Sequence, residues 1–366
     1  MTTDIISPAE IQSELSRIWD SLEGANKTRA SLFNLIFFTK KKARAEYIRA
    51  ISQNVIEKFP SRVIFITEDV ESKEDYLNTR VSVLSLQNGS SDIACDFIQI
   101  DVAGKQEERV PFVILPHILP DLPVYVIWAE DPANQSPLFA QLQKLATRLI
   151  FDSESITSLS QFAQNLIHFD TEMRVDIADL NWARMESWRD LLASTFYSAE
   201  RLAQLQKSTK IQICYNAQES AIYCHTQIQS IYLQGWLATQ LGWQLEKLHS
   251  ENGKVTFLYK RQGGTVEITL LSEFHETLKP GIILSVDLET EDQNHFSLGR
   301  QLETPNHVCM RFSTLEKCDM PLKYIFAKDE SGQSLVKEIC HRGTSKHYLN
   351  LLEQIKDRKE FSFCEY

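Results

Sequence analysis

The chain has 366 residues, of which 43% are hydrophobic and 10% aromatic, which is enough for two folded domains. Its formal net charge of −11 argues against a general nucleic-acid or membrane-surface binder, because both need a basic footprint. The sequence has no run of about 18 apolar residues and no apolar signal core near its start, so we expect a cytoplasmic protein without a membrane span.

The cysteine and glycine content excludes several kinds of site. There are seven cysteines, an odd number, and no pair has the CxxC spacing of a zinc ribbon or a thioredoxin-type site. Only 12 glycines are present, which argues against phosphate-cradling loops because those loops depend on glycine.

Residues 1–28 are predicted to form an N-terminal helix of their own. Ser7-Pro8 is a suitable N-terminal cap for a helix that runs through Trp19. Gly24-Ala25-Asn26 is expected to end this segment. One face of the helix is apolar and consists of Ile11, Leu15, Ile18 and Leu22.

Residues 29–207 are predicted to form an α/β domain. Continuous apolar strands alternate with helices, a pattern typical of a mostly parallel, Rossmann-like sheet that is covered on both faces. The expected strands are residues 31–39, 62–67, 80–86, 97–102, 124–128 and 148–151. The expected helices are residues 43–59, 110–119, 138–146 and 158–169.

A tryptophan-rich stretch follows, and we predict one helix from about Asp179 to beyond Leu202, with Asp179 as its N-cap. One apolar stripe has Arg184 in its middle, and a second apolar group includes Arg189. The stripe consists of Ile177, Leu180, Trp188, Leu191 and Thr195, and the second group of Trp182, Met185, Leu192 and Phe196. A helix covered on two sides is either a strut inside the chain or part of a docking surface.

Residues 211–366 are predicted to form an α+β domain, with the boundary between Leu205 and Ala221. A helix over residues 221–241 carries Cys224 and Gly235 on one face, and Gly235 marks either a weak helix or a close packing contact. The expected strands are residues 211–215, 282–289 and 307–312, and residues 255–261 and 265–271 form a hairpin across Gly263-Gly264. Residues 334–352 close the domain as a helix or a helix pair.

No catalytic signature, cofactor or metal site is predicted. A dinucleotide-binding fold carries GxGxxG after its first strand, but here that strand is followed by Thr39-Lys40-Lys41-Lys42-Ala43-Arg44. The sequence therefore predicts a Rossmann-like sheet that lacks the glycine-rich nucleotide loop. Lys40, Lys41, Lys42 and Arg44 form either an anion site or a solvated helix start.

Cys309 and Cys318 flank the end of a predicted strand. They are either a regulatory thiol pair or buried structural thiols. Taken together, the missing signatures favour a binding or assembly role over an enzyme.

The tryptophan-rich stretch resembles the signature of a known family. Asp179 to Leu192 follows the pattern D-L-x-W-x-R-x-x-x-W-R-x-x-L of the glucose-6-phosphate dehydrogenase assembly proteins, OpcA. The likeness extends over roughly residues 30–200 and is only general beyond Leu205. Further segments that resemble the family are Ser61–Ile64, Val110–Pro116, Asp121–Val124 with Trp128, and Arg148–Ser153.

The resemblance implies a non-catalytic protein that binds glucose-6-phosphate dehydrogenase and promotes its oligomeric assembly or activation, at entry to the oxidative pentose phosphate pathway. In cyanobacterial members the effect is redox-sensitive through cysteines, but no cysteine pair of this chain clearly matches. The motif residues are partner-binding or structural, and they are Asp179, Asn181, Trp182, Arg184, Trp188 and Arg189. The alternative is a sugar-phosphate- or nucleotide-binding enzyme or sensor, with thiol regulation as a further option.

Overall fold

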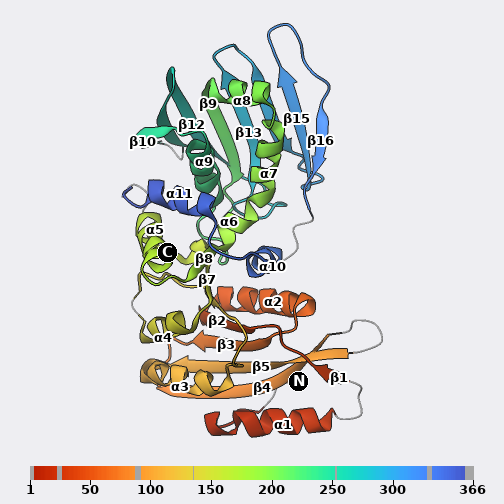
Figure 1. The fold of residues 1–366 in the computed structure, drawn as a ribbon, viewed down its shortest axis with the longest axis vertical. Coiled ribbons are helices and arrows are strands. Elements are labelled where there is room, and N and C mark those ends of the chain that lie inside the picture. Colours follow the sequence, from red (N-terminus) through yellow and green to blue (C-terminus); the bar gives the residue numbers. More distant parts are fainter. Residues whose placement is uncertain are drawn as a thin grey trace. The chain divides into compact units, whose positions relative to one another are not determined.

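The computed structural model describes residues 4–22, 27–86, 92–134, 136–251, 254–327 and 332–358 (Figure 1). The chain forms two compact units, each built from three segments. The first unit contains Met1–Ile156, Asn165–Leu180 and Ser331–Thr344, and the second contains Thr157–Gln164, Asn181–Glu330 and Ser345–Tyr366. The predicted boundary between Leu205 and Ala221 thus falls inside the second unit.

The first unit is built on an eight-stranded sheet in the order β1-β5-β3-β2-β6-β7-β8, with β4 paired to β5. All neighbours are parallel except β4 and β5, which confirms the predicted Rossmann-like sheet. The strands are β1 (Lys27–Arg29), β2 (Asn34–Lys40), β3 (Arg62–Glu68), β4 (Tyr76–Leu86), β5 (Asp92–Ala103), β6 (Val124–Trp128), β7 (Arg148–Phe151) and β8 (Asp176–Asp179).

Helices accompany this sheet. They are α1 (Ile11–Ser21), α2 (Ala43–Lys58), α3 (Val110–Ile114), α4 (Pro137–Leu145), α5 (Leu159–Thr171, shared between the units) and α10 (Gln333–Cys340), with 3-10 turns η1 (Pro8–Glu10), η2 (Gly104–Arg109), η3 (Leu115–His117) and η4 (Ser153–Ser155). The Ser7 N–H donates to Glu10 Oε2 at 3.0 Å, so the predicted helix start is confirmed. Gly24-Ala25-Asn26, the predicted end of this helix, lies outside the described residues.

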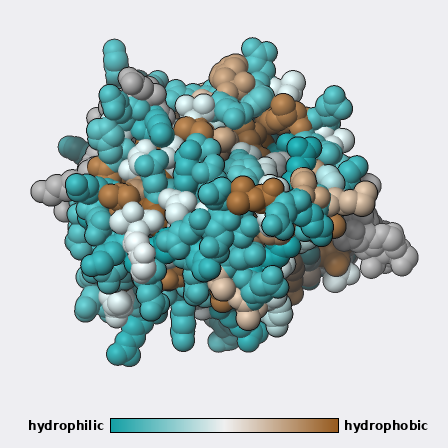
Figure 2. Space-filling view, turned by 90° about the horizontal axis from the view of Figure 1, so that it is seen from above, coloured by the Kyte–Doolittle hydropathy of each residue, from teal (hydrophilic) through white to brown (hydrophobic). Residues whose placement is uncertain are grey.

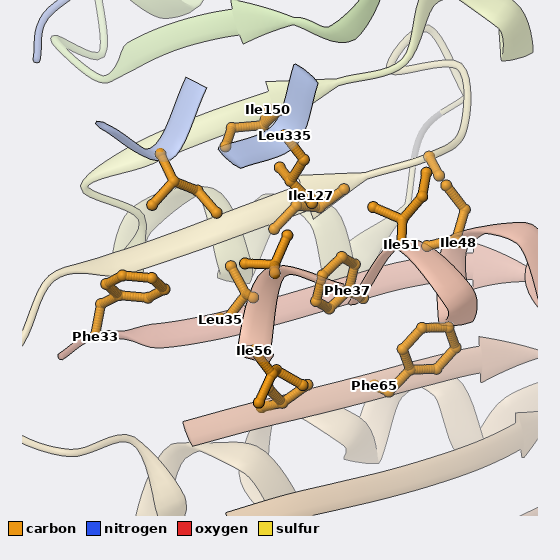
Figure 3. Close-up of a cluster of buried hydrophobic side chains, with 14 of the residues drawn as sticks. Phe33, Leu35, Phe37, Ile48, Ile51, Ile56, Phe65, Ile127, Ile150 and Leu335 are labelled. Carbon is orange, nitrogen blue, oxygen red and sulfur yellow. The ribbon is translucent and has the colours of Figure 1, made fainter. Parts of the chain in front are cut away.

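The apolar core of the first unit lies between α2 and the central strands. Figure 3 shows Leu35 and Phe37 of β2 in one cluster with Ile48, Ile51 and Ile56 of α2. Leu335 of α10 joins the same cluster, although it follows β2 by about 300 residues. Because β2 is buried on both faces, its middle reads Leu35-Ile36-Phe37-Phe38, an apolar run rather than an alternation.

The second unit is built on another eight-stranded sheet, in the order β10-β11-β12-β9-β13-β14-β15-β16. Only β12 and β9 are parallel, so this sheet is mixed. The strands are β9 (Ser208–Asn216), β10 (Gln244–Glu251), β11 (Lys254–Arg261), β12 (Gly264–Glu273), β13 (Ile283–Thr290), β14 (His295–Arg300), β15 (His307–Ser313) and β16 (Leu322–Ile325). The helices are α6 (Leu180–Arg184), α7 (Glu186–Thr195), α8 (Ala199–Gln206), α9 (Ile228–Gln240) and α11 (Lys346–Ile355).

The prediction of one long tryptophan-rich helix is wrong. Its residues form β8 and then three helices, with breaks at Met185 and before Ser198. The Ser198 side chain accepts a hydrogen bond from the Arg201 N–H at 3.2 Å and so caps a new helix. Ile177 lies on β8, so it does not belong to a helical stripe.

The helix predicted over residues 221–241 begins only at Ile228, which leaves Cys224 outside it. The Ser220 hydroxyl accepts the backbone N–H groups of Ile222 at 3.3 Å and Tyr223 at 3.0 Å. Such local side-chain bonds hold the backbone in a turn and compete with helix formation.

The surface is largely polar where it can be seen. Figure 2 shows a mostly hydrophilic face on which apolar groups occur in several separate places. Within the described ranges, each helix is too short or too polar to cross a bilayer.

Candidate functional site

The first candidate site is the carboxyl edge of the parallel sheet in the first unit. The chain passes from β2 through α2 to β3 on one side, and β6 pairs with the other side of β2. The direction of the strand order therefore reverses beside β2. In open α/β sheets, ligands bind at such a point, outside the carboxyl ends of the strands.

The predicted cations lie at this point, but carboxylates hold three of them. The Lys40 N–H donates to Glu130 Oε1 at 2.9 Å, and the Lys40 Nζ lies 3.7 Å from Glu130 Oε2. The Lys41 Nζ lies 2.6 Å from Asp69 Oδ2. Arg44 and Asp152 form an ion pair that is almost completely buried. Lys42 is exposed and directly precedes α2.

Further carboxylates make this edge more acidic. Burial raises the pKa of the Glu68 carboxyl, and the nearby carboxylates of Glu107 and Glu130 raise it further. Hydrogen bonds from Lys41 and the Tyr76 hydroxyl hold the pKa of Asp69 below its usual value. An anionic ligand would therefore have to displace carboxylates from the cations that it needs.

Sequence reasoning missed the three carboxylate partners, although a signal was present. Asp69 follows β3 directly, Asp152 follows β7 directly, and Glu130 lies two residues after β6. The carboxyl ends of parallel strands meet at one edge, so acidic residues just after such strands are brought together there.

The second candidate site is the tryptophan-rich stretch. Trp182 and Arg189 form a stacked pair, in which the guanidinium carbon lies 3.7 Å from the ring centroid. The Arg189 Nη1 also donates to the Trp182 carbonyl at 2.6 Å. The Trp182 ring packs on Tyr348 of α11 at 5.1 Å between centroids. Trp182 is thus held from both sides within the second unit.

Trp188 is also internal to the second unit. Its ring is buried and meets Phe326 edge-on at 5.3 Å between centroids, and the guanidinium of Arg300 lies over both rings. The Arg184 Nη1 donates to Asn181 Oδ1 at 2.9 Å. The bond from Arg184 to Asn181 lies within α6, whereas the ring contacts of Trp182 and Trp188 join α6 and α7 to the rest of the unit.

The six motif residues are not brought together as one exposed surface. Asp179 is buried at the end of β8 in the first unit, where its Oδ1 accepts the Ser153 N–H at 3.1 Å. The other five belong to the second unit. Because both tryptophans are buried, the geometry favours the structural interpretation of this motif over direct partner contact.

The two cysteines singled out from the sequence are also separate. Cys318 lies opposite Ser313, whereas Cys309 lies opposite Lys323. Four residues along β15 correspond to about 13 Å, while a disulfide needs Cα atoms within about 7 Å. The register therefore does not allow a direct bridge between them, and the reactivity of either thiol alone stays a prediction.

Metal-ligating side chains do not cluster in the part of the chain that the structure describes. There, no group of three or more His, Cys, Asp and Glu side chains is arranged to hold an ion.

Comparison with known families identifies the chain. Residues 52–167 match the model of the glucose-6-phosphate dehydrogenase subunit N-terminal domain, and residues 175–341 match that of its C-terminal domain. The chain belongs to the OpcA family of glucose-6-phosphate dehydrogenase assembly proteins. The resemblance found in the sequence is thus confirmed, and it extends beyond Leu205.

Three cyanobacterial relatives support this family assignment, and their names place them provisionally in the OxPP cycle as OpcA. The protein of Synechococcus elongatus is 29% identical over 212 residues, which are 56% of this chain and 45% of that protein. The protein of Nostoc punctiforme is 26% identical over 208 residues, which are 56% of this chain and 42% of that protein. The chain therefore spans less than half the length of these OpcA relatives.

Two solved structures share the fold of this OpcA family member. A complex of levoglucosan dehydrogenase with NADH and L-sorbose matches with a TM-score of 0.50 and 8% identity, covering 88% of this chain and 96% of that chain. A mutant of Gal80p from Saccharomyces cerevisiae matches with a TM-score of 0.51 and 10% identity, covering 89% and 95%. At this identity the likeness concerns the fold alone.

Proposed function

We propose that this chain binds glucose-6-phosphate dehydrogenase and promotes its oligomeric assembly or allosteric activation, without a reaction of its own. Membership of the OpcA family, with matches in both halves of the chain, is the observation that carries the proposal. The names of the relatives refer to the oxidative pentose phosphate cycle, which agrees with this partner.

The carboxyl edge of the first unit supports a role without nucleotide chemistry. A dinucleotide pyrophosphate needs close approach to a backbone turn and uncompensated positive charge. Here the turn between β2 and α2 consists of Lys41 and Lys42, and both carry long side chains. Three of the four nearby cations are already in ion pairs. These ion pairs support a binding role over the alternative of a nucleotide or sugar-phosphate sensor.

Mixing the two purified proteins tests the proposal. We expect multi-angle light scattering to show a joint complex or a shift of the dehydrogenase to a larger oligomer. We also expect the activity of the enzyme at low glucose 6-phosphate to rise. Two independent scattering peaks together with unchanged kinetics would show that the proposal is wrong.

A thermal-shift screen tests the alternative. A ligand at a hundredfold its dissociation constant stabilises a protein by about 2.7 kcal/mol. We expect no shift with NADP, ATP or sugar phosphates. As a matched comparison, Asp69→Asn with Glu130→Gln removes the charged partners of Lys41 and Lys40 and should increase affinity for phosphate. A clear shift of the unmodified protein would favour the sensor.

A further inference from the structure

The outermost strand of the second unit's sheet leaves a backbone edge open. The strand order ends at β16, which pairs with β15 from Met310↔Leu322 to His307↔Ile325 (Figure 1). Across the described ranges, no strand pairs with its other side. Such an edge presents backbone N–H and C=O groups in the geometry that accepts another extended segment.

One face of this edge is apolar and uncovered. Because side chains alternate along a strand, Leu322 and Tyr324 share the face of their β15 partners. Helix α7 covers this face at β15, where Thr195 Oγ1 lies 3.4 Å from the Met310 sulfur. Beyond it, Leu322 is 61% exposed and Tyr324 41% exposed. Large apolar side chains gathered in this way mark an interaction surface.

The opposite face of the same edge carries two cationic side chains beside Ile325, which is 66% exposed. Lys323 points to the side opposite Leu322, and Arg311 of β15 shares that side. Both side chains are exposed. Arg311 and Lys323 take part in no ion pair with the described residues, whereas nearby Lys317 is paired with Asp319 at 2.8 Å. The positive charge on this face is therefore available to a binding partner.

We propose that β16 docks an extended segment of glucose-6-phosphate dehydrogenase as a ninth strand of this sheet. The segment carries apolar side chains on the face of Leu322 and Tyr324 and carboxylates on the face of Arg311 and Lys323. Backbone hydrogen bonds supply affinity, and this alternation supplies specificity. The inference rests on the proposed function and adds the surface and the chemistry of the recognised segment.

Charge disfavours a second copy of this chain as the occupant. Two copies of β16 paired edge to edge about a two-fold axis would form one continuous sheet with the same face up in both. Arg311 and Lys323 of each copy would then lie on the same face, where like charges oppose each other. The short length of β16 and its central lysine are devices by which natural sheets avoid self-association.

A charge reversal tests the proposal in the full chain. We expect Arg311→Glu with Lys323→Glu to raise the dissociation constant for the purified dehydrogenase by about tenfold or more, measured by isothermal titration calorimetry. The matched control is Lys247→Glu with Lys254→Glu, two exposed lysines on β10 and β11 at the opposite edge of the same sheet. The control variant should bind the dehydrogenase with the affinity of the unmodified protein. Both variants should have the melting temperature of the unmodified protein.

Hydrogen exchange tests the backbone pairing itself. On complex formation, we expect amide exchange within residues 322–325 to slow by about tenfold, while exchange in β10 stays unchanged. Unchanged exchange at β16 would overturn strand addition even if the charge reversal weakened binding. If the charge-reversed variant bound the dehydrogenase with unchanged affinity, the proposal that this edge is the docking surface would be wrong. The same would hold if the charge reversal changed only the self-association of this chain. Absence of any complex with the unmodified protein would instead show that the proposed function itself is wrong.

Discussion

A single buried carboxylate joins three elements of the first unit. Asp96 of β5 accepts hydrogen bonds from Trp19 Nε1 at 2.8 Å, Arg29 Nη2 at 2.6 Å and Arg62 Nε at 3.0 Å. These donors come from α1, β1 and β3. Burial alone would raise the pKa of Asp96, but the hydrogen bonds and the positive charge of the arginines outweigh burial and lower it. Asp96 therefore stays ionised in the folded protein.

Replacing Asp96 with Asn should destabilise the protein by about 3–5 kcal/mol, because two arginines lose a buried counter-charge. Since the folded pKa of Asp96 is lowered, its contribution exists above the unfolded value and is lost as pH falls through the folded value. The free energy of unfolding, measured with urea at neutral and at acidic pH, should therefore change less with pH in the Asp96→Asn variant than in the unmodified protein. Asp101→Asn, which breaks the partly exposed pair with Arg80, is the control and should cost clearly less than Asp96→Asn. Equal losses at both positions would contradict the prediction.

The stacked pair of Trp182 and Arg189 decides between the two interpretations of the family motif. Arg189→Lys keeps the charge but loses the planar contact and the bond to the Trp182 carbonyl. We expect a stability loss of about 1 kcal/mol and an unchanged affinity of the folded protein for the dehydrogenase. Unfolding curves and titration calorimetry measure the two quantities separately. A variant of normal stability that no longer binds would make Arg189 a partner contact instead.

At the scale of elements, the sequence predicts strands that contain a continuous apolar run and misses several strands that lack one, such as the interior strand β14 and the edge strands β10 and β16. The apolar runs of β2, β3, β6 and β7 announce those strands, because a covered parallel sheet needs no polar alternation. In contrast, β10 and β16 are mostly exposed edge strands, and neither shows such a run. Propensity cannot find strands of this kind, since pairing with a neighbour defines them.

The candidate site at the carboxyl edge of the first sheet also shows what the sequence alone cannot predict. The cluster at Lys40–Arg44 is visible in the sequence, but its partners are distant in the chain. Asp69 lies 28 residues from Lys41, and Glu130 lies 90 residues from Lys40. Only the strand order brings these charges together, so the local pattern, which left an anion site and a solvated helix start open, could not show that carboxylates pair with three of the cations.

The contact between α9 and α11 depends on the absence of a side chain. A Cβ atom at Gly235 would lie 2.3 Å from Leu351 Cδ1, and Leu351 is fully buried. The sequence left open whether Gly235 marks a weak helix or a close packing contact, and the structure shows the close packing contact.

Gly235→Ala should lower the free energy of unfolding by about 1–2 kcal/mol, because the clash outweighs the better helix propensity of alanine. Combining it with Leu351→Ala should cost less than the sum of the two single changes. Chemical denaturation of the four proteins gives this coupling. A stabilised Gly235→Ala variant would show that Leu351 can move aside.

At the scale of the whole molecule, the binding of an activator and the binding of substrate to the same enzyme affect each other equally. If this chain raises the affinity of the dehydrogenase for glucose 6-phosphate, the sugar phosphate must raise the affinity of the enzyme for this chain by the same factor. We expect a factor of about 5 to 150, measured by titration with and without substrate. Equal affinities would mean that this chain promotes assembly without changing substrate binding.

The division of the first unit into three segments also affects how the protein is made. Helix α10 supplies Leu335 and Ile339 to the core around α2, but it is synthesised about 160 residues after the second segment ends at Leu180. At ribosomal speeds of about 5–20 residues per second, the apolar surface that awaits α10 stays open for roughly 10–30 s. During that interval the nascent chain carries an unfinished core, so its yield in the cell should depend on the chaperones that bind apolar surface during translation.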